Sequence, residues 1–534
     1  MPHPQPAHLV RFDSAWRLLS LVFFGLVASD AALAAKPNVI YFLSDDVGYG
    51  DVGPFKKAGS PARTPNIDRL AAEGMTFTDA HSPAAVCAPT RYSALTGNYP
   101  YRGRSRWGTW RYNRQSQILP GQNTVADVMK AAGYRTGFFG KLHQGGDFYE
   151  KGAATFYRGD NATLVDLNRA FRNGPLDHGF QYSFTLPTGI QNTPYAYFEN
   201  DKYVPINPAQ SGLVFLNAGA KSNGAIINAG YGDANWGSSQ AGPGLTRKAV
   251  DFIDNHHQNN LRNGTATPFM MFYAAPAIHE PNTPPNFFIN GERVKGETGG
   301  GAKADMIYEM DLQVGALLRA LEVRGLLSNT LFIFTSDNGP ELHDTSIPIP
   351  NHDSRGGLRG EKASLHEGGH RVPFIARWGD GTPAGSKIRP GSRSNQLIGI
   401  HDWVAAMYAL TNRPMPADQA LDSANILPIL LGQQSESTPL RDYLVLQAGS
   451  FNHQPYHQHW QAIRRSQWKL ILDTANAPRE LYNLATDLRE TQNVVNDPTK
   501  ATLVSALQKL NSSAVNALPR TVPAWTGATG TPSP

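Results

Sequence analysis

The chain has 534 residues and a mass of 58.2 kDa, and its 40% hydrophobic and 17% charged residues suit a globular protein with at least one large buried core. It carries a formal charge of +5 but shows no long Lys/Arg run and no nucleic-acid motif, which excludes nucleic acid as the expected partner and suits a small anionic substrate. The single cysteine excludes an intramolecular disulfide and any zinc or iron–sulfur site built from several thiolates.

The first 34 residues have the layout of a secretory signal. Arg11 and Arg17 precede an apolar run at 18–28, and Ala32-Leu33-Ala34 offers a cleavage site near Ala34. The alternative is an uncleaved anchor, but the run is shorter than the roughly 20 residues that a spanning helix needs. We therefore expect export without stable membrane insertion, and export without disulfides favours a bacterial periplasm or the extracellular space.

From residue 38 onward, apolar runs that predict buried strands alternate with segments of helical spacing. The predicted strands are 38–43, a run that ends before Gly140, 267–274, 330–335 and 371–376, and the predicted helices are 64–74, 124–133 and 305–324. The first helix has Thr64 as N-cap, Pro65 at its first position and Gly74 as its stop. This alternation predicts an α/β domain around a mainly parallel sheet, with the ligand site at the carboxyl ends of the strands.

Two segments, 187–243 and 291–304, are rich in Gly, Asn, Ala and Pro and have little periodicity, so we expect long surface loops that wall a cleft. Beyond Gln433 the apolar content drops, and a smaller unit follows, with strands predicted at 443–447, 460–464 and 468–472 and a helix at 500–516. The sequence thus predicts a signal at 1–34, a main domain at 36–435, a C-terminal α+β subdomain at 440–518 and a flexible tail at 519–534.

Two of the predicted strands end in polar pairs. Asp45-Asp46 follows the strand at 38–43, and Asp337-Asn338 follows the strand at 330–335. Three carboxylates and one amide oxygen form an all-oxygen set that suits Ca²⁺ or Mg²⁺. Asp and Asn are also common turn formers at strand ends, so a single pair would be weak evidence. Two such pairs in one domain favour a metal site.

The lone cysteine stands in the pentapeptide Cys87-Ala-Pro-Thr-Arg91. A free cysteine is usually a small buried hydrophobic residue, which is the structural alternative here. A proline two residues later and an arginine four residues later are an uncommon combination, and they favour a chemical role for Cys87.

A lysine and two histidines also follow predicted strands. Lys141 and His143 come at the end of one, where an extended backbone would direct both side chains to the same face. His279 follows the strand at 267–274, although a lone histidine is more often a hydrogen-bonded structural residue. Lys362, by composition, is only a lysine in a glycine-rich loop.

Taken in order, these motifs resemble the signatures of the cysteine-type sulfatases of the alkaline-phosphatase-like superfamily, most of all relatives of arylsulfatase A and N-acetylgalactosamine-6-sulfatase. The matching segments are Cys87-Ala-Pro-Thr-Arg-Tyr-Ser-Ala-Leu-Thr-Gly97, Gly137-Phe-Phe-Gly-Lys-Leu-His143, Asp45-Asp46, Leu176-Asp-His-Gly-Phe180, Phe334-Thr-Ser-Asp-Asn-Gly339, Leu358-Arg-Gly-Glu-Lys362, Glu367-Gly-Gly-His-Arg-Val-Pro373 and Glu480-Leu-Tyr-Asn-Leu-Ala-Thr-Asp487. Thr90 replaces a commoner serine and Leu142 a frequent tryptophan, and neither change removes a functional neighbour.

The resemblance implies a large, mainly parallel sheet flanked by helices, with a smaller C-terminal antiparallel sheet plus a helix. It also implies that a formylglycine-generating enzyme oxidises Cys87 to formylglycine, whose hydrated form attacks sulfur. One Ca²⁺, in preference to Mg²⁺, would be held by Asp45, Asp46, the modified Cys87, Asp337 and Asn338. Asp337 would also accept the proton of the attacking hydroxyl.

The remaining roles are implied by the resemblance in the same way. Arg91 would fix the nucleophile and the carboxylates on the metal side. Lys141 and Lys362 would clamp sulfate oxygens, and His143 would contact the nucleophile and assist release of the sulfate. His279 would protonate the leaving oxygen as a general acid.

The expected activity is hydrolysis of sulfate esters, either aryl sulfates or sulfated saccharides, with release of inorganic sulfate. One alternative is a phosphate or phosphonate ester hydrolase of the same superfamily, because both ester classes are tetrahedral and suit similar clamps. Another is an inactive glycan-binding relative, which is disfavoured because no expected catalytic position is substituted. Specificity is expected in the loops at 187–243 and in the aromatic and His-rich segment 451–460.

Overall fold

The computed structural model describes residues 36–159, 161–210, 212–219, 226–342, 349–449 and 460–516. The predicted signal at 1–34, the tail at 519–534 and nearly all of the segment 451–460 lie outside the described residues. Among the described helices, none is both long enough and apolar enough to cross a membrane.

A ten-stranded sheet organises the main part of the described chain, in the order β15-β2-β14-β13-β1-β12-β4-β7-β8-β9. Its strands are β1 (Asn38–Ser44), β2 (Met75–Phe77), β4 (Arg135–Lys141), β7 (Tyr182–Leu186), β8 (Tyr197–Glu199), β9 (Lys202–Val204), β12 (Phe269–Ala274), β13 (Thr330–Ser336), β14 (Phe374–Arg377) and β15 (Ser392–Ser394). The central strands β13, β1, β12, β4 and β7 are all parallel. β14 and β8 join this block antiparallel on either side. The predicted mainly parallel sheet is therefore confirmed, with its antiparallel pairings outside the centre.

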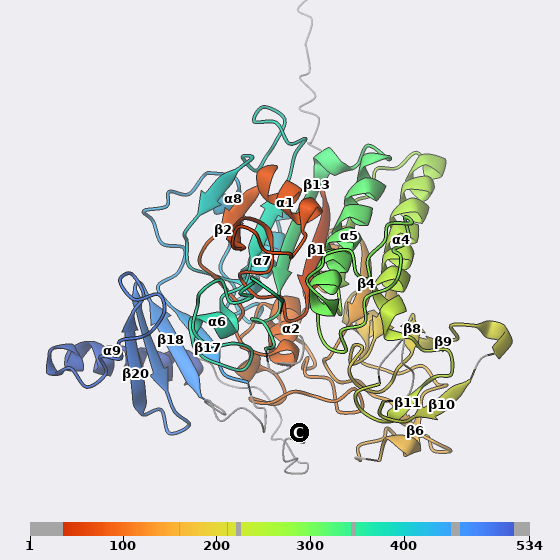
Figure 1. The fold of residues 1–534 in the computed structure, drawn as a ribbon, viewed down its shortest axis with the longest axis horizontal. Coiled ribbons are helices and arrows are strands. Elements are labelled where there is room, and N and C mark those ends of the chain that lie inside the picture. Colours follow the sequence, from red (N-terminus) through yellow and green to blue (C-terminus); the bar gives the residue numbers. More distant parts are fainter. Residues whose placement is uncertain are drawn as a thin grey trace, which may run out of the picture. The chain divides into compact units, whose positions relative to one another are not determined.

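Helices cover both faces of this sheet (Figure 1). They are α1 (Pro65–Ala72), α2 (Cys87–Thr96), α3 (Val125–Ala131), α4 (Ala241–Asn263), α5 (Ala302–Glu322), α7 (Trp403–Leu410) and α8 (Leu427–Leu430). The short helix α6 (Glu367–His370) contacts the C-terminal sheet instead. Alternate residues of β1 point to opposite faces, because successive side chains of a strand do so. Ile40 and Phe42 pack with residues of α1, α4 and α5, whereas Tyr41 packs with residues of α2, α3 and α7. Burial on both faces explains the unbroken apolar run that predicted this strand.

The C-terminal part forms a separate four-stranded antiparallel sheet in the order β17-β18-β19-β20. Its strands are β17 (Leu444–Gln447), β18 (Gln461–Arg465), β19 (Trp468–Leu472) and β20 (Pro478–Asn483), and helix α9 (Ala501–Asn516) packs against it. The meander and its helix match the expected fold class. The last strand, β20, was not predicted.

The loop expected at 187–243 is partly wrong. This segment contains β8 and β9, an antiparallel pair formed by β10 (Leu213–Leu216) and β11 (Gly230–Asp233), and the first residues of α4. Tyr195 and Trp236 within it are buried in the core. Its strands are short and lie among Gly, Asn and Pro residues, so the local composition hid them. The second expected loop, 291–304, is irregular up to Gly301, after which α5 begins.

Two further pairs of short strands lie outside the large sheets. β3 (Ala80–His81) pairs with β16 (Ile398–Gly399), and β5 (Tyr149–Glu150) pairs with β6 (Val165–Asp166). The first of these pairs joins the segment before α2 to the segment before α7.

Candidate active site

The two polar pairs predicted at strand ends lie together at one edge of the large sheet. β1 and β13 are neighbours in parallel register, with Ser44 opposite Ser336, so the residues that follow both strands meet. The backbone N–H of Asp46 donates to Asp337 Oδ1 at 3.2 Å, and Asn338 Nδ2 donates to Asp46 Oδ1 at 2.8 Å. The predicted convergence of these oxygens is thus present in the structure.

This oxygen cluster has the properties of a cation site. Asp45, Asp46, Asp337 and Asn338 are at most 1% exposed. Asp45 Oδ1 and Asn338 Oδ1 are buried without a hydrogen-bond donor, which is costly unless another partner is bound. Asp45, Cys87 and Asp337 each offer one atom that could bind a metal, and these three atoms lie within 4.8 Å of one another. Carboxylate and amide oxygens in such an arrangement fit a hard divalent cation.

Cys87 is the first residue of α2 and faces this cluster. The helix follows extended Val86 and ends at Gly97, whose left-handed backbone caps it. Cys87 Sγ lies 3.3 Å from His143 Nδ1 and is 3% exposed. Burial raises the pKa of the thiol, although Lys141 and Lys362 oppose that shift. The unmodified thiol is therefore held neutral and is not primed to act as a thiolate nucleophile.

Arg91 lies one turn after Cys87 on the same face of α2. Its Nε donates to Asp337 Oδ2 at 2.9 Å, and its Nη2 is 2.7 Å from the same oxygen and 3.5 Å from Asp45 Oδ2. Its Nη1 donates to the carbonyl of Lys141 at 3.1 Å. This buried guanidinium therefore links the helix to the ends of β1, β13 and β4.

Lys141 and His143 both reach the site, but not by the predicted alternation of an extended strand. Lys141 ends β4, and its Nζ donates to Asp45 Oδ2 at 2.7 Å. His143 has a φ of 51°, so the chain has already left the extended conformation there. That turn directs the imidazole to Cys87, a backbone feature that the residue spacing did not reveal.

Lys362 and His279 close the other side of the site. Lys362 Nζ donates to Asp46 Oδ2 at 2.7 Å and lies 3.2 Å from His279 Nε2. His279 Nδ1 is 2.9 Å from the carbonyl of Glu280, which favours a proton on Nδ1 and a free lone pair on Nε2. Burial and Lys362 lower the pKa of His279 to about 4, so its imidazole is neutral at pH 7 before substrate binds.

The carboxylates respond differently to these cations. Burial would raise the pKa of Asp45, but Lys141 and Arg91 outweigh it and hold that pKa well below its ordinary value. For Asp337, burial and the charge of Asp45 prevail over Arg91 and raise the pKa to about 7. The carboxyl of Asp337 can therefore both bind and release a proton near pH 7.

Two further residues belong to the site and were not predicted. Gln144 Nε2 donates to the carbonyl of Ala88 at 2.8 Å, which ties the segment after β4 to the first turn of α2. Glu341 Oε2 lies 3.7 Å from Lys362 Nζ. Its position three residues after Asn338 was a usable signal for Glu341, whereas no sequence pattern marked Gln144.

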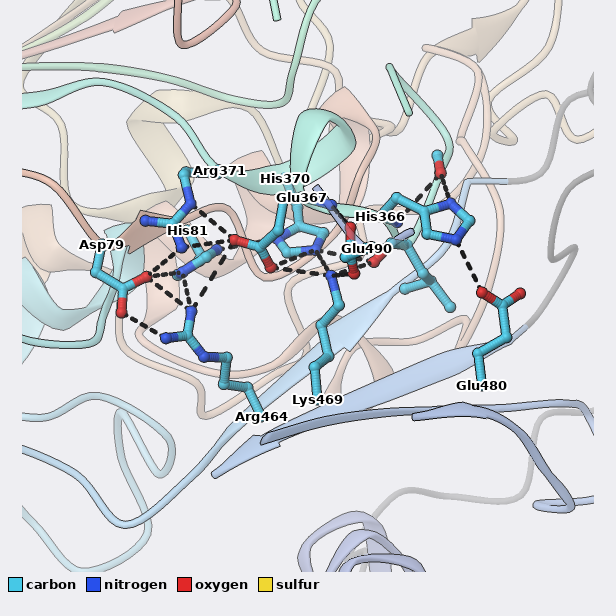
Figure 2. A network of polar contacts seen from close by, with 12 residues as sticks. Asp79, His81, His366, Glu367, His370, Arg371, Arg464, Lys469, Glu480 and Glu490 are labelled. Atoms are coloured by element: carbon cyan, nitrogen blue, oxygen red, sulfur yellow. Dashed lines mark hydrogen bonds and ion pairs between the residues drawn. The ribbon is translucent and has the colours of Figure 1, made fainter. Parts of the chain in front are cut away.

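A second group of potential metal ligands, His81, Glu367 and His370, lies against one face of the C-terminal sheet (Figure 2). Lys469 of β19 donates to Glu367 Oε1 at 2.9 Å, and Arg371 Nη2 lies 2.7 Å from Glu367 Oε2. Both oxygens of this carboxylate are therefore matched by protein cations, whereas Asp45 Oδ1 in the first cluster has no hydrogen-bond partner. This network joins the segment that carries Lys362 to the C-terminal sheet.

Comparison with known proteins identifies the family. A family model described as Sulfatase matches residues 37–413. The chain belongs to the sulfatase family. A second model, described as N-sulphoglucosamine sulphohydrolase, C-terminal, matches residues 360–515. The reaction class expected from the motifs, that of a sulfuric ester hydrolase, is confirmed.

Curated sulfatases are similar over most of the chain. An N-acetylgalactosamine-6-O-sulfatase of Bacteroides thetaiotaomicron is 31% identical over 506 residues, which cover 86% of this chain and 89% of the relative. Human arylsulfatase A is 30% identical over 408 residues, covering 76% of this chain and 70% of the relative.

Solved structures agree with the fold. A protein described with the metabolism of multiple glycosaminoglycans by Bacteroides thetaiotaomicron has a TM-score of 0.73 and 29% identity, and the match covers 90% of this chain and 100% of that chain. A structure in complex with D-glucosamine-2-N,6-O-disulfate has a TM-score of 0.59 at 18% identity, over 90% of this chain and 98% of that one, and supports the fold alone.

Proposed function

We propose that this sulfatase is an exported enzyme that removes sulfate from saccharides, with formylglycine made from Cys87 as its nucleophile and one Ca²⁺ as its metal. The observation that carries the proposal is the surroundings of Cys87. A buried, neutral thiol lies beside orphaned carboxylate and amide oxygens and within a set of cations. A thiol gains nothing from such surroundings, whereas a sulfate anion and a polarised hydroxyl do.

The donor set supports Ca²⁺ because it consists of oxygens and leaves two of them without a partner. Asp45, Asp46, Asp337 and Asn338 would hold the ion, together with the modified side chain of residue 87. When present, hydrated formylglycine supplies the attacking hydroxyl and Ca²⁺ supplies Lewis-acid stabilisation of the sulfate charge. A formylglycine-generating enzyme would carry out the maturation of Cys87.

The chain's own side chains then perform positioning and proton transfer. Asp337 would take the proton of the attacking hydroxyl, and Arg91 would orient both that carboxylate and residue 87. Lys141 and Lys362 extend ammonium groups into the site from β4 and from the 358–373 segment, and they would clamp sulfate oxygens. His143, which lies 3.3 Å from Cys87 Sγ, would hold the nucleophile.

His279 would donate a proton to the leaving alcohol oxygen. Its Nε2 lies beside Lys362 Nζ, so a sulfate clamped by that lysine would place its ester oxygen near the imidazole. The low pKa of His279 makes the free imidazole a poor acid at pH 7. The role therefore requires that the negative charge of the bound sulfate raise this pKa, as an adjacent anion does.

A saccharide is proposed as the substrate because the relative with 31% identity over most of both chains is named an N-acetylgalactosamine-6-O-sulfatase. An aryl sulfate would serve as an assay substrate, since arylsulfatase A is also a relative. The layout of residues 1–34 supports export to a periplasm or the exterior.

The test is release of inorganic sulfate by purified, Ca²⁺-loaded enzyme from a panel of defined sulfated saccharides, with a matched pair of an aryl sulfate and an aryl phosphate. The proposal expects release from at least one saccharide and a strong preference for the sulfate of the matched pair. Faster release of phosphate would favour the phosphate ester hydrolase. Saccharide binding without sulfate release would favour the inactive glycan-binding relative.

A further inference from the structure

A strongly basic segment follows the helix that carries Cys87 and Arg91. Residues 101–114 read Tyr-Arg-Gly-Arg-Ser-Arg-Trp-Gly-Thr-Trp-Arg-Tyr-Asn-Arg and contain five arginines and no acidic residue. No Asp or Glu occurs between Asp79 and Asp127. We call residues 101–114 the arginine segment. None of the roles assigned above uses it.

Hydrogen bonds place the arginine segment beside the catalytic centre, on the side of His143. The backbone N–H of Arg104 donates to the carbonyl of Gln117 at 3.1 Å, and the N–H of Gln117 donates to the carbonyl of Gln144 at 2.9 Å. Gln144 directly follows His143. At the other end of the segment, the carbonyl of Arg114 accepts from the N–H of Gly146 at 2.7 Å. Arg104 is thus separated from Gln144, the residue next to His143, by one chain segment and two backbone hydrogen bonds.

Two arginines of the segment, Arg102 and Arg104, differ in the partners that their guanidinium groups bind. Arg102 forms a bidentate ion pair with Asp422, at 2.6 and 2.8 Å, and is structural. Arg104 donates through Nε to the carbonyl of Ser116 at 2.8 Å, and across the described ranges no carboxylate lies within 4.0 Å of its guanidinium. Its side chain is partly exposed. Arg104 therefore offers a guanidinium that is oriented by the backbone but lacks a counter-ion.

A nearby carboxylate, that of Asp147, is already engaged by other donors. Asp147 is buried and already accepts from Arg158 and from Asn173. Burial lowers the pKa of Arg104, and among the neighbouring charges Asp147 opposes this shift while Arg158 adds a smaller effect in the same direction as burial. Arg114 adds another cation to the group, since its Nη1 donates to the carbonyl of Arg158 at 2.6 Å. The segment thus brings arginine side chains, Arg104 among them, next to a site built for an anion.

We propose that the arginine segment, with Arg104 at its centre, is a second anion subsite that binds a carboxylate or a further sulfate on the sugar unit next to the one being desulfated. This inference rests on the proposed function and narrows its substrate to an oligosaccharide with several anionic groups. A guanidinium suits either anion, because its planar donors match carboxylate and sulfate oxygens in pairs.

The experiment compares three disaccharides that carry the same cleavable sulfate and differ only on the neighbouring sugar, which has a hydroxyl, a carboxylate or a second sulfate. kcat/KM for sulfate release is measured for the wild type and for Arg104→Gln. We expect the substitution to lower kcat/KM about 10-fold more on a disaccharide with a second anion than on the neutral one, the size typical of a charged hydrogen bond. Arg104→Lys keeps the charge but loses the paired geometry, so its effect is intermediate. The differential effect shrinks as salt rises.

Arg479→Gln is the matched control, since it removes the same charge from an exposed side chain on β20. We expect this control to change kcat/KM only slightly, and to the same extent on all three disaccharides. An equal effect of Arg104→Gln on neutral and anionic substrates would overturn the inference, whatever its size. Absence of sulfate release from any disaccharide or aryl sulfate by the wild type would instead refute the proposed function, so the two failures are distinguishable.

Discussion

Lys469 Nζ and Glu367 Oε1 lie 2.9 Å apart, and both side chains are fully buried. The pair joins the C-terminal sheet to α6, five residues after Lys362. Lys469 also lies 2.5 Å from Glu490 Oε1, so one ammonium group neutralises two buried carboxylates. The C-terminal sheet therefore contributes to the support of the segment that brings Lys362 to the active site.

Lys469→Met removes this shared cation. Two carboxylates are then buried without it, so we expect the free energy of unfolding to fall by about 3–5 kcal/mol, the usual effect of breaking a buried ion pair on one side. Chemical denaturation followed by circular dichroism measures it. The double variant with Glu490→Gln recovers part of the loss. As a control, Arg465→Gln, at the exposed end of β18, changes stability by no more than about 0.5 kcal/mol. If Lys469→Met unfolded at the same denaturant concentration as the wild type, this network would not stabilise the protein.

Removal of the metal tests the oxygen cluster. We expect a chelator to abolish sulfate release and to lower the melting temperature, because the orphaned oxygens of Asp45 and Asn338 lose their partner. Ca²⁺ at about 100 times its Kd should add roughly 2.7 kcal/mol to the stability of the metal-free protein. Asn338→Ala should weaken Ca²⁺ binding in calorimetry. Full activity of protein shown by elemental analysis to be metal-free would refute the site.

His279→Ala tests the proposed general acid. A poor leaving group needs a proton and an activated aryl oxygen does not, so the loss on a saccharide sulfate should exceed the loss on a nitrophenyl sulfate by about 10²-fold or more. Steady-state kcat values on both substrates give the comparison. Equal slowing on the two would remove His279 from that role.

A buried glutamate on α5, Glu309, should make the stability of the protein depend on pH. Burial raises the pKa of Glu309 to about 8, against an ordinary value of 4.5. Between these values the unfolded chain has lost a proton that the folded chain retains, so this residue makes stability fall as pH rises from about 4.5 to about 8. Glu309→Gln should remove that contribution, which is up to about 1.4 kcal/mol per pH unit. Denaturant melts of both proteins from pH 5 to 8 measure it, and parallel curves would show that Glu309 ionises normally in the fold.

The central strands and their acidic ends could be predicted because the signals are local. A strand buried on both faces is a continuous apolar run, as at 38–43, and the polar residues that end it are adjacent in sequence. That β1 and β13 are neighbours could not be read from such runs, because it depends on pairing between residues about 290 positions apart. The position of both acidic pairs at the carboxyl ends of strands in one mainly parallel sheet predicted a shared site, and the resemblance to the sulfatases added the roles of its residues.

Other elements gave no local signal. All ten residues of α2 are buried, so the helix that positions Cys87 has no amphipathic pattern. β8 and β20 are short or lie at an edge of their sheets, and they are defined by their partners. The left-handed turn at His143 and the ion pairs of Lys469 depend on tertiary contacts, so neither could be predicted. His143 entered the predicted site through its place in a motif after a strand, and Lys469 lies in no such motif.

The most direct test of the account is the chemical state of residue 87 in active enzyme. Peptide mass spectrometry on protein produced together with its maturation enzyme should find Cys87 converted to formylglycine, and sulfate release should rise in proportion to the converted fraction. Cys87→Ala should abolish release while the protein remains folded. A fully active preparation in which residue 87 is entirely an unmodified thiol would contradict the proposed mechanism.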